Sequence, residues 1–211
     1  MVCGERIADV GTDHAYLPLW LVLTGKCSHA YASDIADGPL AKAAESIKGY
    51  EDKISLVKAD GLKGIPEEGV DCIVIAGMGG DMIERIISDS GWEFDGKTLI
   101  LQPMTKLTEL RKWLWEAGFS VLDERLSEDA GKLYRAFKAV KAPSAKPEPW
   151  ELWAGRSLFE HSDPLLGLWL DRYIASLRRA CDGLLSGGLI PDAELSEALE
   201  SLIKKREELN N

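Results

Sequence analysis

The chain has 211 residues, 45% hydrophobic and 28% charged, which is enough for one full domain and a small appendage. A net charge of −10 counts against a passive, wholesale binder of polyanions, although a local basic patch stays compatible with it. Four cysteines without a CxxC pair indicate reduced thiols rather than disulfides or a metal site, and no apolar stretch reaches the ~20 residues of a membrane span, so we expect a cytoplasmic protein without membrane contact.

Strand-like and helix-like patterns alternate between residues 6 and 141. Short apolar runs that end at Gly, Asp or Pro predict strands at 6–10, 29–34, 54–60, 71–77 and 97–103. The segments between them predict helices at 15–24, 38–48, 80–90 and 106–118. This alternation is typical of a parallel, doubly wound α/β sheet.

The end of this region breaks the alternation. Two strands, 119–129 and 133–142, are joined only by the short turn AGK. They must pair antiparallel, because a parallel crossover needs about a dozen residues or more. A parallel sheet closed by an antiparallel hairpin is how class I methyltransferases end, whereas an NAD-binding Rossmann domain continues with another βα unit. The predicted fold is therefore Rossmann-like, of the class I methyltransferase type.

A Pro-rich stretch, residues 142–149, predicts a boundary between a first domain, 1–141, and a helical domain, 150–211. In the helical domain, leucines and aromatic residues recur at spacings of three and four. The sequence SGGLIP interrupts this pattern, which then resumes. The pattern predicts a helical hairpin with a coiled-coil-like seam.

The stretch DVGTDHAYLP, where the first strand turns into a helix, offers backbone N–H groups to a polar ligand, and Gly11 permits the tight turn. Asp34 ends the second strand, where a carboxylate can accept hydrogen bonds from both hydroxyls of a ribose. Asp60 and Gly61 follow the third strand and suit an adenine amino group. The single glycine favours S-adenosylmethionine, which has no phosphate, over a dinucleotide. The simpler alternative is that these aspartates only form turns.

The fourth strand ends in AGMGG, residues 76–80, at the sheet edge where a transferred group would meet its acceptor. N6-adenine methyltransferases usually place Asn or Asp followed by Pro-Pro here, and the chain has no such motif. Gln102, in LQP at the end of the fifth strand, presents a carboxamide on the same rim.

The motifs ADVGTDHAYLP, SDIADGPL, DGL, IAGMGG and LILQP together resemble the bacterial family that methylates N1 of adenine 22 in tRNA. The resemblance covers residues 6–141 in order and extends more loosely into the helical hairpin. It implies an S-adenosylmethionine-dependent enzyme with tRNA as its partner. Members of that family carry a basic helical segment before the first strand, whereas here this strand begins at Arg6. Three explanations of this difference stay open: the start of the sequence is misassigned, the chain has been trimmed, or this member lacks the segment. Each of them bears on whether this chain has full activity.

The cofactor-binding residues expected on this basis are Asp9, Gly11, Asp13, Asp34, Ile35, Asp60, Gly61, Gly77, Met78 and Gly79. Asp13 and His14 are the catalytic candidates. N1 of adenine needs no base to attack a sulfonium methyl, but the product is cationic, so a carboxylate near it would be stabilising. For Asp13 the alternatives are a contact to the methionine amine or helix N-capping, and for His14 a packed, structural position.

The substrate-binding residues expected from the sequence are Gln102, Lys106, Arg111, Arg178 and Arg179. Lys106 and Arg111 follow the fifth strand near the rim, and the Arg178–Arg179 pair lies late in the first hairpin helix. Cations at that end could equally complement the helix dipole. Tyr16, Trp20 and Trp92 are conceivable stacking partners for an exposed base, although each is more often a core residue.

Three other functions stay open at this stage: a methyltransferase with another acceptor, an NAD-dependent oxidoreductase, and a non-catalytic RNA- or partner-binding module. The single-glycine turn and the terminal hairpin disfavour the oxidoreductase. The oligomeric state is also open, with a monomer as one option.

Overall fold

The computed structural model describes residues 1–2, 4–191 and 193–209. Its contacts divide the chain into two compact units, each with its own core. Unit 1 comprises Met1–Asp123 and Ala136–Ser144, and unit 2 comprises Glu124–Arg135 and Ala145–Asn211. The tip of the strand hairpin therefore belongs to unit 2 together with the C-terminal helices.

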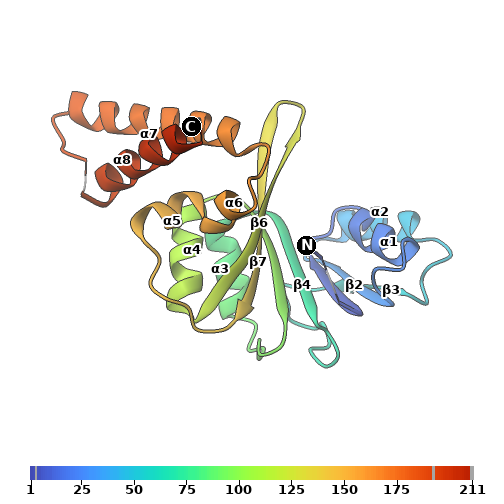
Figure 1. Ribbon diagram of the computed structural model, residues 1–211. Coiled ribbons are helices and arrows are strands. Elements are labelled where there is room, and N and C mark those ends of the chain that lie inside the picture. The colour runs from blue at the N-terminus through green and yellow to red at the C-terminus, as the bar shows by residue number, and fades with distance from the viewer. Residues whose placement is uncertain (3, 192, 210–211) are drawn as a thin grey trace. The chain divides into compact units, whose positions relative to one another are not determined.

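A seven-stranded sheet has the order β3-β2-β1-β4-β5-β7-β6. Its strands are β1 (Arg6–Val10), β2 (His29–Asp34), β3 (Ile54–Lys58), β4 (Cys72–Gly79), β5 (Thr98–Thr105), β6 (Phe119–Asp129) and β7 (Lys132–Lys141). The first five strands pair in parallel, and β7 pairs antiparallel with β5, with Leu99 opposite Ala139. The predicted fold class, a parallel sheet closed by an antiparallel hairpin, is confirmed (Figure 1).

Helices of unit 1 cover both faces of the parallel strands. They are α1 (Tyr16–Leu23), α2 (Asp37–Ser46), α3 (Gly80–Ser88) and α4 (Leu107–Glu116). Strand β4 shows why both faces are covered: Ile73 and Ile75 belong to the cluster that includes residues of α3 and α4, whereas Cys72 and Val74 belong to the cluster with residues of α1 and α2. All four are at most 2% exposed, as expected for a strand that is apolar on both sides.

The order of the strands reverses between β1 and β4, because the chain runs outward through β2 and β3 and then returns to the other side of β1. In sheets of this kind the crevice outside the carboxyl ends of the strands at the reversal is the usual ligand site. The turns after β1, β2, β3 and β4 all lie at this edge.

Unit 2 contains four helices among its described residues: α5 (Pro149–Ala154), α6 (Arg156–Glu160), α7 (Leu166–Ser186) and α8 (Ala193–Glu208). Helices α7 and α8 are the predicted helical pair, and buried side chains of both, such as Leu170 and Leu202, share one core. Helices α5 and α6 were not expected as separate elements. Glu148 and Glu151 form a capping box that begins α5, with Pro149 in its first turn.

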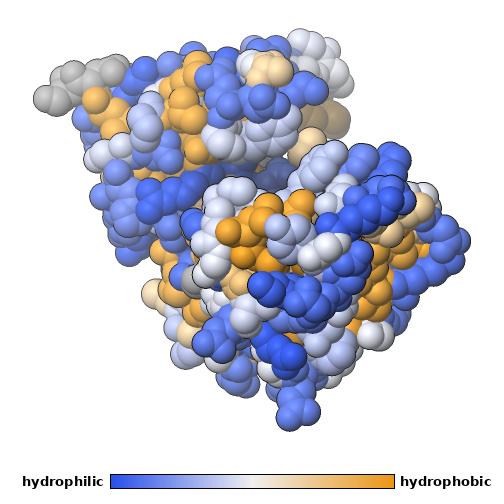
Figure 2. Space-filling view, turned by 90° about the vertical axis from the view of Figure 1, so that its right-hand side faces the viewer, coloured by the Kyte–Doolittle hydropathy of each residue, from blue (hydrophilic) through white to orange (hydrophobic). Residues whose placement is uncertain are grey.

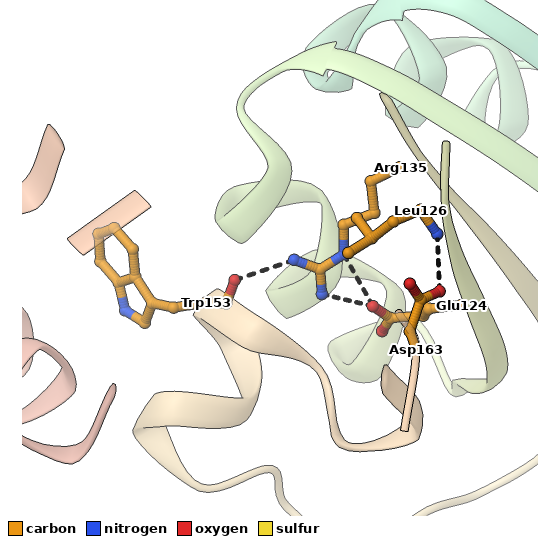
Figure 3. Close-up of polar contacts among 5 residues, drawn as sticks. All are labelled: Glu124, Leu126, Arg135, Trp153 and Asp163. Atoms are coloured by element: carbon orange, nitrogen blue, oxygen red, sulfur yellow. Dashed lines mark hydrogen bonds and ion pairs between the residues drawn. The ribbon is translucent and has the colours of Figure 1, made fainter. Parts of the chain in front are cut away.

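A buried polar network holds the hairpin tip within unit 2 (Figure 3). Glu124 of β6 is 1% exposed and forms an ion pair with the guanidinium of Arg135 of β7, which donates through Nε at 2.8 Å. Arg135 also donates to the carbonyl of Trp153 at 3.1 Å, and its guanidinium lies 4.6 Å from the ring centre of Trp169. Gly155 packs so closely on the Glu124 carboxylate that a Cβ there would overlap it.

None of the helices among the described residues has the length and apolar character needed to cross a membrane.

Candidate functional site

A cavity of about 410 Å³ lies in unit 1 outside the carboxyl ends of β1 to β4. Its lining residues are Val10, Gly11, Asp34, Ile35, Ala59, Asp60, Gly61, Met78, Gly79, Met82, Arg85 and Ile86. Seven of the residues predicted from the strand-end turns are thus brought together around one space. Its volume is in the range of small-molecule sites in proteins.

The turn after β1 is fixed by its backbone. The N–H groups of Gly11 and Thr12 both donate to the carbonyl of Ser33 at 2.8 Å, which ties this turn to β2. Gly11 has φ +79°, a left-handed conformation that favours glycine, and a Cβ there would overlap the Met78 side chain. The side chain of Met78 therefore approaches the turn where a ligand would enter.

Asp13 and His14 lie on the turn between this cavity and α1. The Asp13 side chain is 68% exposed, with Oδ2 at 3.4 Å from Nε2 of His14 and Oδ1 at 3.7 Å from Nζ of Lys42. Neither residue caps α1, because its N-cap position is Ala15, whose N–H donates to Oγ1 of Thr12 at 3.1 Å. The capping alternative for Asp13 is thus wrong, and its carboxylate is available at the surface.

Asp9, unlike Asp13, is a buried carboxylic acid. It lies within β1 and is 8% exposed, and burial raises its pKa to about 6, against a lowering effect of the hydrogen bond with Thr12. It does not line the cavity, so its expected part in cofactor binding would be indirect, through the turn that follows it.

The raised pKa of Asp9 predicts a pH dependence of folding. Between about pH 4 and 6 the folded protein holds a proton that the unfolded chain releases, so stability falls as the pH rises through this window. Asp9→Asn lacks this contribution. The difference between the free energies of unfolding, variant minus wild type, should therefore increase from pH 4 to pH 7. Urea unfolding at several pH values measures it. Asp95→Asn, an exposed site, is the control, and a relative stability that decreases with pH would contradict the prediction.

Two carboxylates line the cavity from neighbouring strand ends. Oδ1 of Asp34 accepts the N–H of Ala36 at 2.8 Å, which holds this half-buried side chain at the rim. Asp60 lies 3.6 Å from Nζ of Lys63 and 3.9 Å from the Arg85 guanidinium. Among the described residues, Oδ2 of Asp34 has no hydrogen-bond partner, and it is the atom best placed to accept from a ligand hydroxyl.

Gln102 performs a structural task that the sequence did not indicate. Its Oε1 accepts the N–H of Gly77 at 2.9 Å, and its Nε2 donates to the carbonyl of Pro103 at 3.2 Å. The register between β4 and β5 shifts between Ala76 and Met78, so Gln102 fixes the irregular end of β4. The expected contact of its carboxamide with a substrate base stays a prediction. Such a contact would compete with these two hydrogen bonds.

The start of α3 packs against the turn after β5. A Cβ at Gly80 would overlap the carbonyl oxygen of Lys106 and lie 3.0 Å from that of Thr105. Nζ of Lys106 contacts Oδ2 of Asp81 at 3.1 Å, and this hydrogen bond lowers the pKa of Asp81. The Lys106 side chain is 54% exposed and stays compatible with its expected role at a phosphate.

Gly80→Ala should destabilise the protein by roughly 1–3 kcal/mol, because the new methyl group must displace backbone atoms rather than a flexible side chain. Gly38→Ala is the matched control, since that glycine lies in α2 with open space around its Cα, and we expect it to be neutral or stabilising by up to ~1 kcal/mol. Urea unfolding distinguishes the two. Equal midpoints for both variants would show that the close approach at Gly80 is unimportant.

The expected phosphate contact of Arg111 does not fit the structure. Arg111 is 6% exposed, and its guanidinium lies 4.7 Å from the ring centre of Phe137, where it supports the packing of α4 in unit 1. The helical spacing of the sequence could not show that this cation points inward. In unit 2, by contrast, Arg178 and Arg179 are exposed on α7.

The aromatic candidates differ in position. Tyr16 and Trp20 on α1 are exposed, whereas Trp92 packs partly against the core of unit 1. Three residues that were not predicted at the site, Met82, Arg85 and Ile86, line the cavity from one face of α3. Their spacing of three and four residues directly after AGMGG was the signal that could have identified them.

Comparison with known proteins agrees with this geometry. Residues 1–137 match the family model described as a methyltransferase domain. The tRNA (adenine(22)-N(1))-methyltransferase of Bacillus subtilis (strain 168) is 40% identical over 139 residues, which are 64% of this chain and 58% of that protein. The chain thus spans less than two thirds of the length of this curated relative.

Solved structures match over almost the whole chain. The structure of Sp1610 from Streptococcus pneumoniae is 31% identical with a TM-score of 0.81, and the match covers 100% of this chain and 95% of Sp1610. Sp1610 has also been solved in complex with S-adenosyl-L-methionine, with 29% identity, a TM-score of 0.82 and coverage of 96% and 92%. The B. subtilis m1A22 tRNA methyltransferase TrmK is 27% identical with a TM-score of 0.77, over 97% of this chain and 90% of TrmK.

Proposed function

Because the chain belongs to the TrmK-like family of tRNA (m1A22) methyltransferases, with a class I methyltransferase domain, we propose that it transfers a methyl group from S-adenosylmethionine to N1 of adenine 22 in tRNA. The observation that carries the proposal is the cavity at the strand ends, which two carboxylates, Asp34 and Asp60, line from adjacent turns. With tRNA as its substrate, we propose that the enzyme acts in the cytoplasm.

The residues of the cavity fit this cofactor. Its volume of about 410 Å³ accommodates a nucleoside-sized molecule, and Asp34 stands where a ribose would be held. Ile35 and Met82 offer apolar surface for a purine, and Asp60 offers an acceptor for its amino group. Two of the three charged residues that line the cavity are acidic, and this excess of negative charge favours a cofactor that carries positive charge over one that carries a pyrophosphate.

When bound, S-adenosylmethionine supplies an electrophilic methyl group on a sulfonium sulfur. In the transfer the lone pair of adenine N1 forms the new N–C bond as the C–S bond breaks, and the positive charge moves from sulfur to the adenine ring. No proton has to leave N1, so the chain needs to position the two reactants and stabilise the charge.

Asp13 is the proposed source of that stabilisation. Its exposed carboxylate lies on the turn that begins at Gly11, which lines the cavity, and it already has the two cationic or polar neighbours His14 and Lys42. His14 is held in place by stacking on Tyr16, with ring centres 4.9 Å apart and planes 5° apart. We propose that His14 orients Asp13 or the acceptor base.

The proposed phosphate contacts use Lys106 in unit 1 and Arg178 and Arg179 in unit 2, all of which are exposed. Since the protein is acidic overall, these contacts must be local. Two cations of α8 are already engaged: Arg206 pairs with Asp171, and Lys205 lies 4.0 Å from the ring centre of Trp150.

Mass spectrometry of nucleosides tests the proposal directly. Unmodified tRNA is incubated with the protein and isotopically labelled S-adenosylmethionine, digested and analysed. Labelled 1-methyladenosine that disappears when adenine 22 is replaced would support the proposal. Labelled product at another base would indicate a different acceptor, and cofactor binding without any transfer would indicate a binding module.

Asp13→Asn should lower the turnover number much more than it lowers the affinity for tRNA, because the charge that it removes matters most when the adenine becomes cationic. Steady-state kinetics with varied tRNA separate the two constants. Asp37→Asn, an exposed carboxylate on α2 that pairs with Lys58, is the control. A loss of activity that only follows a loss of thermal stability would assign Asp13 a structural role instead.

A further inference from the structure

The first helix has an exposed face that its packing in unit 1 does not use. Tyr16, Trp20 and Leu23 are 66%, 49% and 56% exposed, and their spacing of four and three residues puts them on one side of α1. The opposite side is buried through Leu21 and Val22. A helix of eight residues that is apolar all round is normally enclosed, so an exposed face of this kind indicates an interaction surface.

The side of unit 1 that carries α1 and α2 faces the viewer in Figure 2, which shows orange hydrophobic surface between blue hydrophilic side chains there. Two features of α1 give this surface a specific chemistry. Tyr16 lies parallel to the imidazole of His14, so aromatic rings are stacked directly beside the proposed catalytic turn. The exposed Lys26 places its Nζ 4.6 Å from the ring centre of Trp20.

Aromatic side chains with an adjacent cation form a suitable binding surface for single-stranded nucleic acid, because bases stack on the rings while phosphates approach the ammonium group. An aliphatic helix from another protein would need apolar area but no cation. The surface is also close to the cavity along the chain, because Tyr16 follows Gly11, which lines the cavity, by only five residues.

We propose that Tyr16 and Trp20, together with Lys26, form a stacking surface for unpaired bases of the RNA substrate next to the base that is methylated. This inference rests on the proposed function, and it adds the surface that receives the flanking nucleotides. An adenine of a folded tRNA has to leave its stack before it can reach the cofactor, and Trp20 replaces part of the stacking that its neighbours lose. Lys26 supplies positive charge at this surface of a chain that is acidic overall.

The test compares Trp20→Ala, Trp20→Phe and Leu23→Ala with wild type. Leu23→Ala removes apolar area from the same face without removing a ring, and it is the matched control. Dissociation constants are measured with unmodified tRNA and with a short RNA hairpin that carries 2-aminopurine beside the target adenine. We expect Trp20→Ala to weaken binding roughly 5- to 100-fold, the range for loss of one stacked base. Trp20→Phe and Leu23→Ala should stay within about threefold of wild type.

Stacking also has a spectroscopic signature. Wild type and Trp20→Phe should quench 2-aminopurine fluorescence on binding, and Trp20→Ala should not. Unchanged affinity and quenching in Trp20→Ala, in a protein that methylates tRNA, would overturn the stacking surface while the proposed function stands. An equal loss in Leu23→Ala would also overturn it in favour of a purely apolar docking face. If wild type binds the hairpin through Trp20 but transfers no methyl group, the proposed function fails and the stacking surface stands.

Discussion

Asp34→Ala is expected to weaken S-adenosylmethionine binding by roughly 2–4 kcal/mol, or about 30- to 700-fold in the dissociation constant. The side chain is held at the cavity rim because Oδ1 accepts the N–H of Ala36 at 2.8 Å, so we expect Oδ2 to accept from a bound ribose with little freedom to turn away. Two hydrogen bonds to a charged acceptor are lost together, and such bonds are stronger than neutral ones. Isothermal titration calorimetry with the cofactor measures the change.

The controls separate the carboxylate from its surroundings. Asp37→Ala removes an acid three residues further along, which pairs with Lys58 and does not line the cavity, and it should bind the cofactor as wild type does. Parallel titration with NAD tests the distinction between cofactor classes, and we expect no binding. Wild-type affinity in Asp34→Ala would show that this carboxylate serves only the turn that it forms with Ala36.

The parallel sheet was predictable from the sequence because its strands are short, apolar on both faces and stopped by clear turn residues. Strand β4 could be recognised in DCIVIAG since Cys72, Ile73, Val74 and Ile75 are all buried. The hairpin was predictable from the length of its turn alone, since three residues cannot carry a parallel crossover. The sequence could not show that the tip of this hairpin packs with the C-terminal helices, because that depends on contacts between Glu124, Arg135 and residues far along the chain.

The candidate site was also predictable only in part: the positions of its residues were, and the directions of their side chains were not. Residues at strand ends could be assigned to a common edge since parallel strands end together, and Gly11, Asp34 and Asp60 do line one cavity. Side-chain direction could not be read in this manner. Arg111 lies on a helix that begins near the rim, yet it faces Phe137, and Gln102 uses its carboxamide on the backbone of Gly77. Tertiary packing decided both, and no local pattern encodes it.

Arg135→Met is expected to destabilise unit 2 by roughly 3–5 kcal/mol, the cost of breaking a buried ion pair by removing one partner. The substitution retains most of the side-chain volume but leaves the carboxylate of Glu124, which is 1% exposed, without its cation. It also removes the donor to the carbonyl of Trp153. A buried charge without a partner costs several kcal/mol, whereas the intact pair contributes little more than it costs to desolvate.

A double-mutant cycle distinguishes this explanation from a loss of packing. Glu124→Leu combined with Arg135→Met removes both charges, so the double variant should recover a large part of the stability that Arg135→Met loses. Arg172→Met is the matched control, because Arg172 also contacts the hairpin tip, at Gly131 and Glu128, but is 48% exposed, and surface pairs contribute about 0–1 kcal/mol. Unfolding by urea, followed by far-UV circular dichroism and by limited proteolysis of the C-terminal helices, gives the free energies. Two outcomes would contradict this explanation: Arg135→Met lowers the free energy of unfolding no more than Arg172→Met does, or the double variant loses as much as the two single variants together. In either case the hairpin tip is held by apolar contacts such as that of Leu126, and the ion pair only fills the space between them.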